Sequence, residues 1–294
     1  MAKIDAVCAI PPEQVFERQP HWNEEFALDA CEDVSDFNVK MGHEIATQLK
    51  KGRDENYEIA LILSAGPMGM YRWATYFLNE WGVDCSHVYG FNRDVWSDKD
   101  GNTMSASAKG SFSEGMSEVF YGRLDKGIPE SQRNFATRET LPTYPDKIKA
   151  IRSRGGKLIT IYGVGRTCHI AFWEPHFIED DNSVEEWRKA EYRLGAQLHP
   201  LTLEQNSLIS FKSILTNMTA TANTIGPGIF LTSDYTIGGV EGVVGRGMNW
   251  QGMSLWMTLR YGADPWAPSS MMPGLPGRFF FVKELAGPFI SAVN

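Results

Sequence analysis

Residues 158–175 read LITIYGVGRTCHIAFWEP, and this stretch decides the fold. Residues 158–162 form a short run of apolar and β-branched side chains, typical of a strand buried on both faces of a parallel sheet. Gly163 and Gly165 follow at once, and glycines after a strand permit tight turns and a close approach of the backbone to a ligand. The stretch therefore predicts a buried strand that opens into a polar loop able to carry an active site.

His169 and Glu174 are the chemically significant residues of that loop. They stand five residues apart, so an imidazole and an orienting carboxylate can share one pocket, as general acid–base catalysis requires. The alternative is a structural histidine bonded to backbone groups. Cys168 lies next to His169, but adjacent side chains in extended backbone point to opposite faces, which disfavours a thiolate–imidazole pair.

The other elements alternate along the chain. Buried strands are expected at residues 59–63, 88–91 and 279–282, with a further candidate at 235–244. The apolar spacing and composition predict helices near residues 36–51, 68–81, 144–154, 180–194 and 250–261, another ending at 120, and loops at 97–113 and 265–276. This alternation predicts a three-layer α/β fold, Rossmann-like and doubly wound, with helices on both faces of a mainly parallel sheet.

Ligands of such sheets bind beyond the carboxyl ends of the strands. Three polar or glycine-bearing segments leave predicted strand ends, at residues 64–67, 92–94 and 163–169. Asp94 is a candidate general base in the second segment, although an aspartate at the start of a loop also commonly caps a helix. Residues 163–165 lack the third glycine of a dinucleotide fingerprint, and no Walker-type phosphate loop occurs, so no nucleotide cofactor is expected.

The length of 294 residues suits one large α/β domain. Prolines at positions 11, 12 and 20 interrupt any regular pattern near the start. We therefore expect residues 1–35 to form an N-terminal extension that wraps the domain, and residues 36–294 to form a single α/β domain. The apolar content of 43% and charged content of 22% are ordinary for a globular protein with a well-buried core.

Charge and cysteine usage argue against several kinds of partner. A formal charge of −8 leaves no basic footprint for nucleic acid or an anionic membrane surface. The four cysteines are too dispersed for a disulfide framework and lack zinc-ligand spacing, so no metal is expected. The start lacks an apolar signal core and no run reaches the ~20 apolar residues of a membrane span, so we expect a cytoplasmic protein.

Two motifs resemble those of the glucosamine-6-phosphate isomerase/deaminase family, which shares its superfamily with 6-phosphogluconolactonase. Residues 91–94, Phe-Asn-Arg-Asp, resemble the family's Phe-Asn-x-Asp-Glu-Tyr. Residues 163–175 resemble its Gly-x-Gly-x-Asp-Gly-His-Ile-Ala-Phe-Asn-Glu-Pro. Residues 61–71 look like its sugar-phosphate loop and following helix, and residues 202–207 and 224–226 echo later blocks in the right order. The chain is identified as a divergent member over about residues 36 to 280.

The resemblance implies an activity and a set of site residues. Asp94 would shuttle a proton between sugar carbons 1 and 2, and His169 would open the pyranose ring, supported by Glu174 and by Thr167 at the position of a relay aspartate. The implied reaction is aldose–ketose isomerisation coupled to loss of a 2-amino group as ammonia, without cofactor or metal. The substrate, a sugar or sugar phosphate, would contact Ser64, Ala65, Gly66, Pro67, Met68, Gly163, Gly165, Arg166 and Arg246. Family members are often oligomeric, which suggests a homo-oligomer.

Departures from the family pattern concentrate on the phosphate. Thr167 and Val95 replace acidic residues, Cys168 replaces a glycine and Trp96 a tyrosine. Leu208 replaces the arginine that grips the phosphate, the phosphate loop is two residues shorter, and a later lysine has no counterpart unless Arg246 substitutes for it. Each lost phosphate contact weakens binding by roughly 1–3 kcal/mol.

Three functions stay open from the sequence. The first is a sugar isomerase or deaminase acting on an aminosugar or related sugar with altered phosphate recognition. The second is a non-catalytic sugar-binding or regulatory relative, which Thr167 and Val95 favour. The third is a sugar-lactone hydrolase, the sister activity on this fold, which also uses a histidine in this loop.

Overall fold

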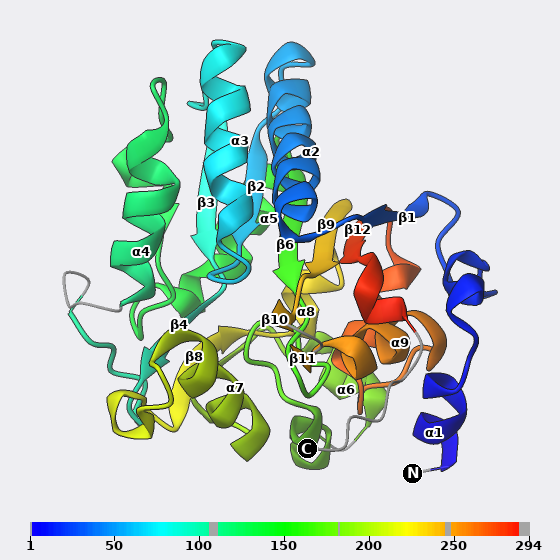
Figure 1. Cartoon of the computed structure of the whole chain (residues 1–294). Helices are drawn as coiled ribbons and strands as arrows, with labels where there is room; N and C mark the ends of the chain where they lie inside the picture. Colours follow the sequence, from blue (N-terminus) through cyan, green and yellow to red (C-terminus); the bar gives the residue numbers. More distant parts are fainter. Residues whose placement is uncertain (1, 106–110, 182, 245–247, 288–294) are drawn as a thin grey trace.

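The computed structural model describes residues 2–105, 111–181, 183–244 and 248–287, and it is built around a seven-stranded sheet (Figure 1). The strand order is β1-β12-β9-β6-β2-β3-β5, and every neighbouring pair is parallel. The strands are β1 (Phe26–Cys31), β12 (Gly277–Val282), β9 (Tyr235–Val240), β6 (Lys157–Gly163), β2 (Ile59–Leu63), β3 (Val88–Asn92) and β5 (Arg133–Asn134).

Helices cover both faces of this sheet. α2 (Val34–Asp54) and α3 (Gly69–Glu80) pack side by side in front of it in Figure 1, while α5 (Tyr144–Ser153) packs behind it on β2 and β6. The prediction of a three-layer α/β fold is confirmed. The further α-helices are α1 (Ala2–Cys8), α4 (Phe112–Val119), α6 (Val184–Lys189), α7 (Pro200–Ser210), α8 (Pro227–Phe230) and α9 (Gly252–Arg260).

A second, antiparallel sheet extends from the end of β3. Its order is β4 (Asp94–Ser97), β8 (Thr221–Ile225) and β7 (Tyr192–Gln197). Only Arg93 separates β3 from β4, so the chain passes from the large sheet to the small one at the residue before Asp94. A two-stranded ribbon, β10 (Val243–Val244) with β11 (Met248–Asn249), follows β9.

Most predicted elements lie within a few residues of their expected bounds, but several observed elements were not expected, among them β1, β7 and the other two strands of the small sheet, β4 and β8. Residues 26–31 were not expected to be a strand, but they form the edge strand β1 inside the segment assigned to an extension. Residues 180–194 do not form one helix, because only α6 is helical and β7 begins at Tyr192. β1 and β7 lie at sheet edges and have half-exposed side chains, so neither shows the continuous apolar run of a central strand. β8 is buried at every position in the middle of the small sheet, but its sequence Thr-Ala-Asn-Thr-Ile is not an apolar run. The expected loop at 265–276 contains a 3₁₀ helix, Pro268–Gly274.

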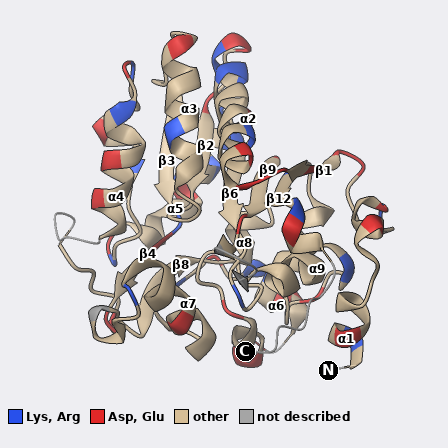
Figure 2. Ribbon diagram, viewed as in Figure 1, with Lys and Arg blue, Asp and Glu red and all other residues tan. Residues whose placement is uncertain are grey.

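Charges are dispersed over the outer helices. Figure 2 shows basic and acidic residues interspersed along α2, where Lys40 pairs with Asp36 and Lys50 with Asp54 at helical spacing. None of the described helices is long and apolar enough to cross a membrane.

Candidate active site

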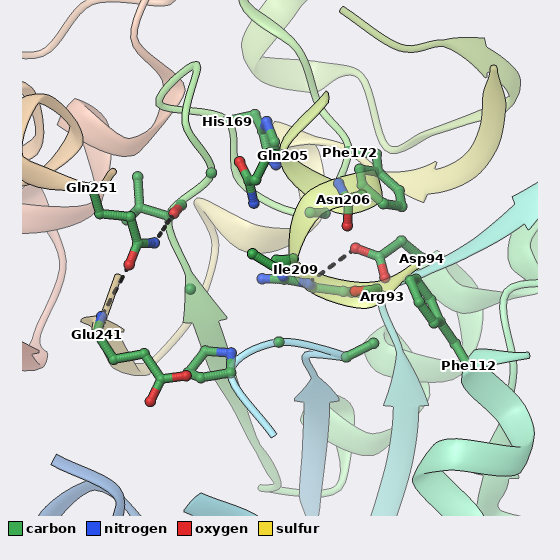
Figure 3. Close-up of a pocket in the computed structure, with 18 of the residues that line it drawn as sticks. Arg93, Asp94, Phe112, His169, Phe172, Gln205, Asn206, Ile209, Glu241 and Gln251 are labelled. Atoms are coloured by element: carbon green, nitrogen blue, oxygen red, sulfur yellow. Dashed lines mark hydrogen bonds and ion pairs between the residues drawn. The ribbon is translucent and has the colours of Figure 1, made fainter. Parts of the chain in front are cut away.

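A pocket of about 150 Å³ lies where the carboxyl ends of β2, β3 and β6 meet α7 (Figure 3). The loop after β2 contributes Ala65, Gly66 and Pro67, and the loop after β6 contributes residues 163–165 and His169. The volume is below the ~300–1,000 Å³ typical of sites for drug-sized ligands. The pocket therefore suits a small molecule.

His169 reaches this pocket because the loop after β6 folds back on itself. Its backbone carbonyl accepts a hydrogen bond from the Gly165 N–H at 3.1 Å, and Cys168 takes the left-handed conformation with φ of 64°. A Cβ added at Gly165 would overlap Cε1 and Nε2 of the His169 ring. The His169 imidazole lies against the backbone of the turn at Gly165. Glycine is required there, because any residue with a Cβ would overlap the ring.

Thr167 connects His169 to Glu174. The Thr167 hydroxyl lies 2.8 Å from Nδ1 of His169 and donates to Oε2 of Glu174 at 2.8 Å, while Nδ1 and Oε2 are 3.5 Å apart. With its one proton given to Glu174, the hydroxyl accepts from Nδ1–H of His169. This fixes the ring tautomer and leaves Nε2, which no described residue contacts by a hydrogen bond, as the nitrogen available to a ligand.

Glu174 is fully buried and charged. Burial alone raises the pKa of a carboxyl, but the His169 imidazole and the hydroxyls of Thr202 and Thr167 outweigh it and lower the pKa of Glu174 to about 2. Its other oxygen accepts the backbone N–H of His199 at 3.2 Å, just before α7. The carboxylate is thereby positioned to stabilise a proton on His169.

Asp94 enters the pocket from the small sheet as the first residue of β4. Burial raises the pKa of Asp94, and the Arg93 guanidinium, together with His169 when its imidazole holds a second proton, opposes that rise. Arg93 donates from Nε to Oδ2 of Asp94 at 3.1 Å, the contact dashed in Figure 3. Asp94 therefore does not act as a helix cap. It faces the same pocket as His169, and the two are close enough for the imidazole to influence its titration.

Two backbone donors of the loop predicted to hold a phosphate are already hydrogen-bonded, whereas the start of α3 that follows it has no side-chain cap. The Ser64 N–H donates to the Tyr71 hydroxyl at 2.9 Å, and the Gly66 N–H donates to the Ser64 hydroxyl at 3.1 Å. Pro67 has no N–H. Ser64 is completely buried, and neither Ser64 nor Met68 lines the pocket.

The predicted cationic contacts to a phosphate are not gathered in the pocket. Arg166 turns away from it, because its guanidinium pairs with Glu204 on the exposed side of α7. Leu208 is also exposed on α7. Arg246 lies outside the described residues. Within the described part of the chain, Arg93 is the only Lys or Arg that lines the pocket.

Cys168 does not act with His169. Its thiol is buried, and burial raises its pKa to about 12, so it stays protonated at neutral pH. It is absent from the pocket lining, in agreement with the sequence argument against a thiolate–imidazole pair. No cluster of three or more potential metal-ligating side chains occurs among the described residues.

The sequence reasoning missed several pocket residues. Arg93 lay inside a quoted motif, but nothing in the sequence indicated its burial. Gln205 and Asn206 line the pocket from α7; both belong to the quoted block 202–207, but neither was proposed as a site residue. Glu241 follows β9 without any motif, and burial raises its pKa to about 7. Gln251 accepts the backbone N–H groups of residues 241 and 242, and so fixes Glu241 at the pocket wall.

The fold of this chain was compared with those of known proteins. No family model matches the chain. A monomeric glucosamine-6-phosphate deaminase superimposes with a TM-score of 0.71 at 17% identity, over 88% of this chain and 98% of that one. The 6-phosphogluconolactonase of Trypanosoma cruzi gives a TM-score of 0.61 at 13% identity, over 91% and 98%. That of Shewanella baltica OS155 gives 0.56 at 15% identity, over 89% and 99%. The chain thus has the fold that these deaminase and lactonase structures share.

Proposed function

We propose that this protein is an acid–base enzyme that isomerises a small aldose to a ketose, with deamination when the sugar carries a 2-amino group. The observation that carries the proposal is the convergence of Asp94 and His169 on one pocket from different sheets. An isomerase needs one group that moves a proton between carbons and one that moves protons on oxygen. Asp94 and His169 are a carboxyl and an imidazole suited to those two tasks.

The roles follow from the partners of each group. His169, with Nδ1 held by Thr167, uses Nε2 to take the proton of the anomeric hydroxyl and to deliver it to the ring oxygen, which opens the ring. The Glu174 carboxylate stabilises the imidazolium through the Thr167 hydroxyl. Asp94 then moves a proton from C2 to C1. In a 2-aminosugar the product is an imine at C2, and water converts it to the ketone and ammonia.

The lining supports a change in phosphate recognition. A phosphate dianion requires cationic side chains and free backbone N–H groups. The N–H groups of Ser64 and Gly66 are already bonded, and Glu241 adds a carboxyl to the pocket wall. Arg93, the one Lys or Arg of the described lining, is already paired with Asp94, so we infer that side chains hold a phosphate less tightly here and that an unphosphorylated sugar is the preferred substrate.

Exchange of the sugar C2 proton tests the proposal. Glucose, glucosamine and their 6-phosphates are incubated with the protein in D₂O and followed by proton NMR, together with an ammonia-release assay. We expect exchange with an unphosphorylated sugar, its loss in Asp94→Asn, and its retention in Asp54→Asn, an exposed aspartate far along α2. Sugar binding without exchange in the whole panel contradicts the proposal and favours a non-catalytic binding protein.

A sugar-lactone hydrolase is the second candidate. The ion pair between Arg93 and Asp94 favours it, because the guanidinium counteracts the basicity that burial gives Asp94, while the His169–Thr167–Glu174 chain is complete without Asp94. Hydrolysis of gluconolactone and its 6-phosphate, followed by proton release, distinguishes the two. Hydrolysis that survives Asp94→Asn but not His169→Ala identifies the lactonase.

A further inference from the structure

Arg93 is a buried cation that its surroundings only partly satisfy. Its side chain is 9% exposed, and Nε bonds to Oδ2 of Asp94. Nη1 is buried and has no hydrogen-bond partner among the described residues. Buried charged groups are normally paired and fully hydrogen-bonded, because leaving a donor unmade costs roughly 1–3 kcal/mol or more. A guanidinium in this state is suited to a ligand acceptor.

Hydrogen bonds to both sheets fix the backbone of Arg93. The Arg93 N–H donates to the Leu63 carbonyl at the end of β2, at 3.1 Å, and the Arg93 carbonyl accepts from Ile225 at the end of β8, at 2.9 Å. Both sheets therefore hold the residue in place. The side chain lines the pocket next to Asp94, as Figure 3 shows. The fold therefore positions Arg93 at the pocket without a bound ligand.

We propose that Arg93 is a catalytic residue that binds the substrate carbonyl oxygen and stabilises the enediolate formed on it. This inference rests on the proposed isomerase function. Because Nε is hydrogen-bonded to the Asp94 carboxylate, a sugar carbon that presents its proton to Asp94 has its oxygen neighbours within reach of the same guanidinium. The planar, forked shape of arginine allows one edge to hold Asp94 while another donor meets the substrate.

The chemical step balances without any further reactant. Asp94 removes the proton of C2, the electron pair of that bond forms the C1=C2 double bond, and the carbonyl pair moves onto O1. O1 then carries the negative charge that Arg93 meets. Return of the proton from Asp94 to C1, with transfer of the O2 proton to O1, gives the ketose. No atom is gained or lost and no redox partner is needed.

Two effects of Arg93 on the reaction are expected. A donor aimed at developing charge in a water-excluded site contributes about 10²–10³ in kcat. The guanidinium also counteracts the rise that burial causes in the pKa of Asp94. Removing it should therefore move the acidic limb of the pH–rate profile to higher pH. If Arg93 had only a structural role, its replacement would lower the stability of the fold without selectively weakening the binding of an enediolate-like ligand.

The test compares a planar enediolate analogue with an uncharged sugar alcohol of the same carbon number. Calorimetric titration of the full chain uses D-arabinonohydroxamate and D-arabinitol, on wild type, Arg93→Met, Arg93→Lys and the control Arg154→Met, whose guanidinium pairs with Glu58 away from the pocket. We expect hydroxamate to bind wild type and Arg154→Met at least tenfold more tightly than arabinitol. In Arg93→Met that preference should disappear, and in Arg93→Lys it should be reduced.

Each other result counts against the proposal. If wild type does not prefer hydroxamate, or if both Arg93 variants keep the preference, Arg93 does not meet the enediolate. Arg93→Lys keeps the charge and serves as the test if Arg93→Met does not fold, as judged by circular dichroism. The C2-exchange assay separates this failure from that of the isomerase itself: exchange that needs Asp94 but is unchanged in the Arg93 variants overturns only the role of Arg93.

Discussion

Replacing Glu174 by glutamine tests the charged relay behind His169. Glutamine keeps the size of the side chain and an oxygen that accepts from Thr167, but it cannot carry the negative charge. In the wild type, burial opposes ionisation, and His169 with the hydroxyls of Thr202 and Thr167 overcomes it, lowering the pKa of Glu174 to about 2. The variant removes that favourable ionisation without emptying the space.

The magnitude follows from the pKa. The folded protein binds a proton at Glu174 more weakly than the unfolded chain, whose glutamates titrate near 4.5. The stabilisation is therefore complete above pH 4.5 and is lost as the pH falls toward 2. At about 1.4 kcal/mol per pKa unit, it amounts to about 3 kcal/mol at pH 6 and about 1 kcal/mol at pH 3.

Urea denaturation at pH 6 and pH 3 measures this difference. We expect Glu174→Gln to be less stable than wild type at pH 6 by about 3 kcal/mol or more, with the gap narrowing by about 2 kcal/mol at pH 3. Glu204→Gln, at an exposed glutamate on α7, is the matched control and should show no such narrowing. A gap that does not change between the two pH values would refute the ionised, hydrogen-bonded Glu174.

Two further predictions concern the pocket wall. Gly165→Ala places a methyl group against the His169 ring, so we expect a loss of roughly 1–3 kcal/mol in urea denaturation together with loss of C2 exchange. Gly252→Ala, where the nearest atom is 3.6 Å away at the start of α9, should be neutral or stabilising; equal behaviour of the two variants would contradict the close approach. For Glu241, burial raises the pKa to about 7, so the folded state binds the extra proton and stability falls as the pH rises from 4.5 through 7. Glu241→Gln should therefore be more stable than wild type at pH 8, by up to about 3 kcal/mol, and similar at pH 4; a gain that is the same at both pH values would exclude this cause.

The sequence predicts the centre of the fold better than its edges. The runs at 59–63 and 158–162 are apolar at nearly every position, because β2 and β6 have helices or strands on all sides. β1 and β7 lie at sheet edges. Their side chains are mostly of intermediate burial, so buried and exposed positions do not alternate clearly along the strand. In β7 a bulge between Arg193 and Ala196 disturbs the alternation further.

The same distinction applies to the site. His169, Glu174 and Asp94 could be proposed because they lie within motifs at strand ends, and the structure places Asp94 and His169 in one pocket with Glu174 behind the imidazole. Arg166 was expected to contact the substrate and instead pairs with Glu204, because the turn that begins at Gly165 directs its side chain toward α7. Glu241 has no motif around it, and only the fold brings it to the pocket.

Glu174, which lies behind His169, and Glu241, which lines the pocket, have pKa values shifted in opposite directions. Both carboxyls are largely withdrawn from solvent, yet the pKa of one falls to about 2 and that of the other rises to about 7. The difference lies in their neighbours. Glu174 has two hydroxyls, a backbone N–H and an imidazole around it, whereas the buried Oε2 of Glu241 has no partner among the described residues. Below pH 7, Glu241 therefore holds a proton and can donate it in a hydrogen bond to a sugar hydroxyl. Above pH 7 the same group becomes an anion whose Oε2 has no partner among the described residues, and it repels a phosphate, so discrimination against phosphorylated sugars should increase across this pH range.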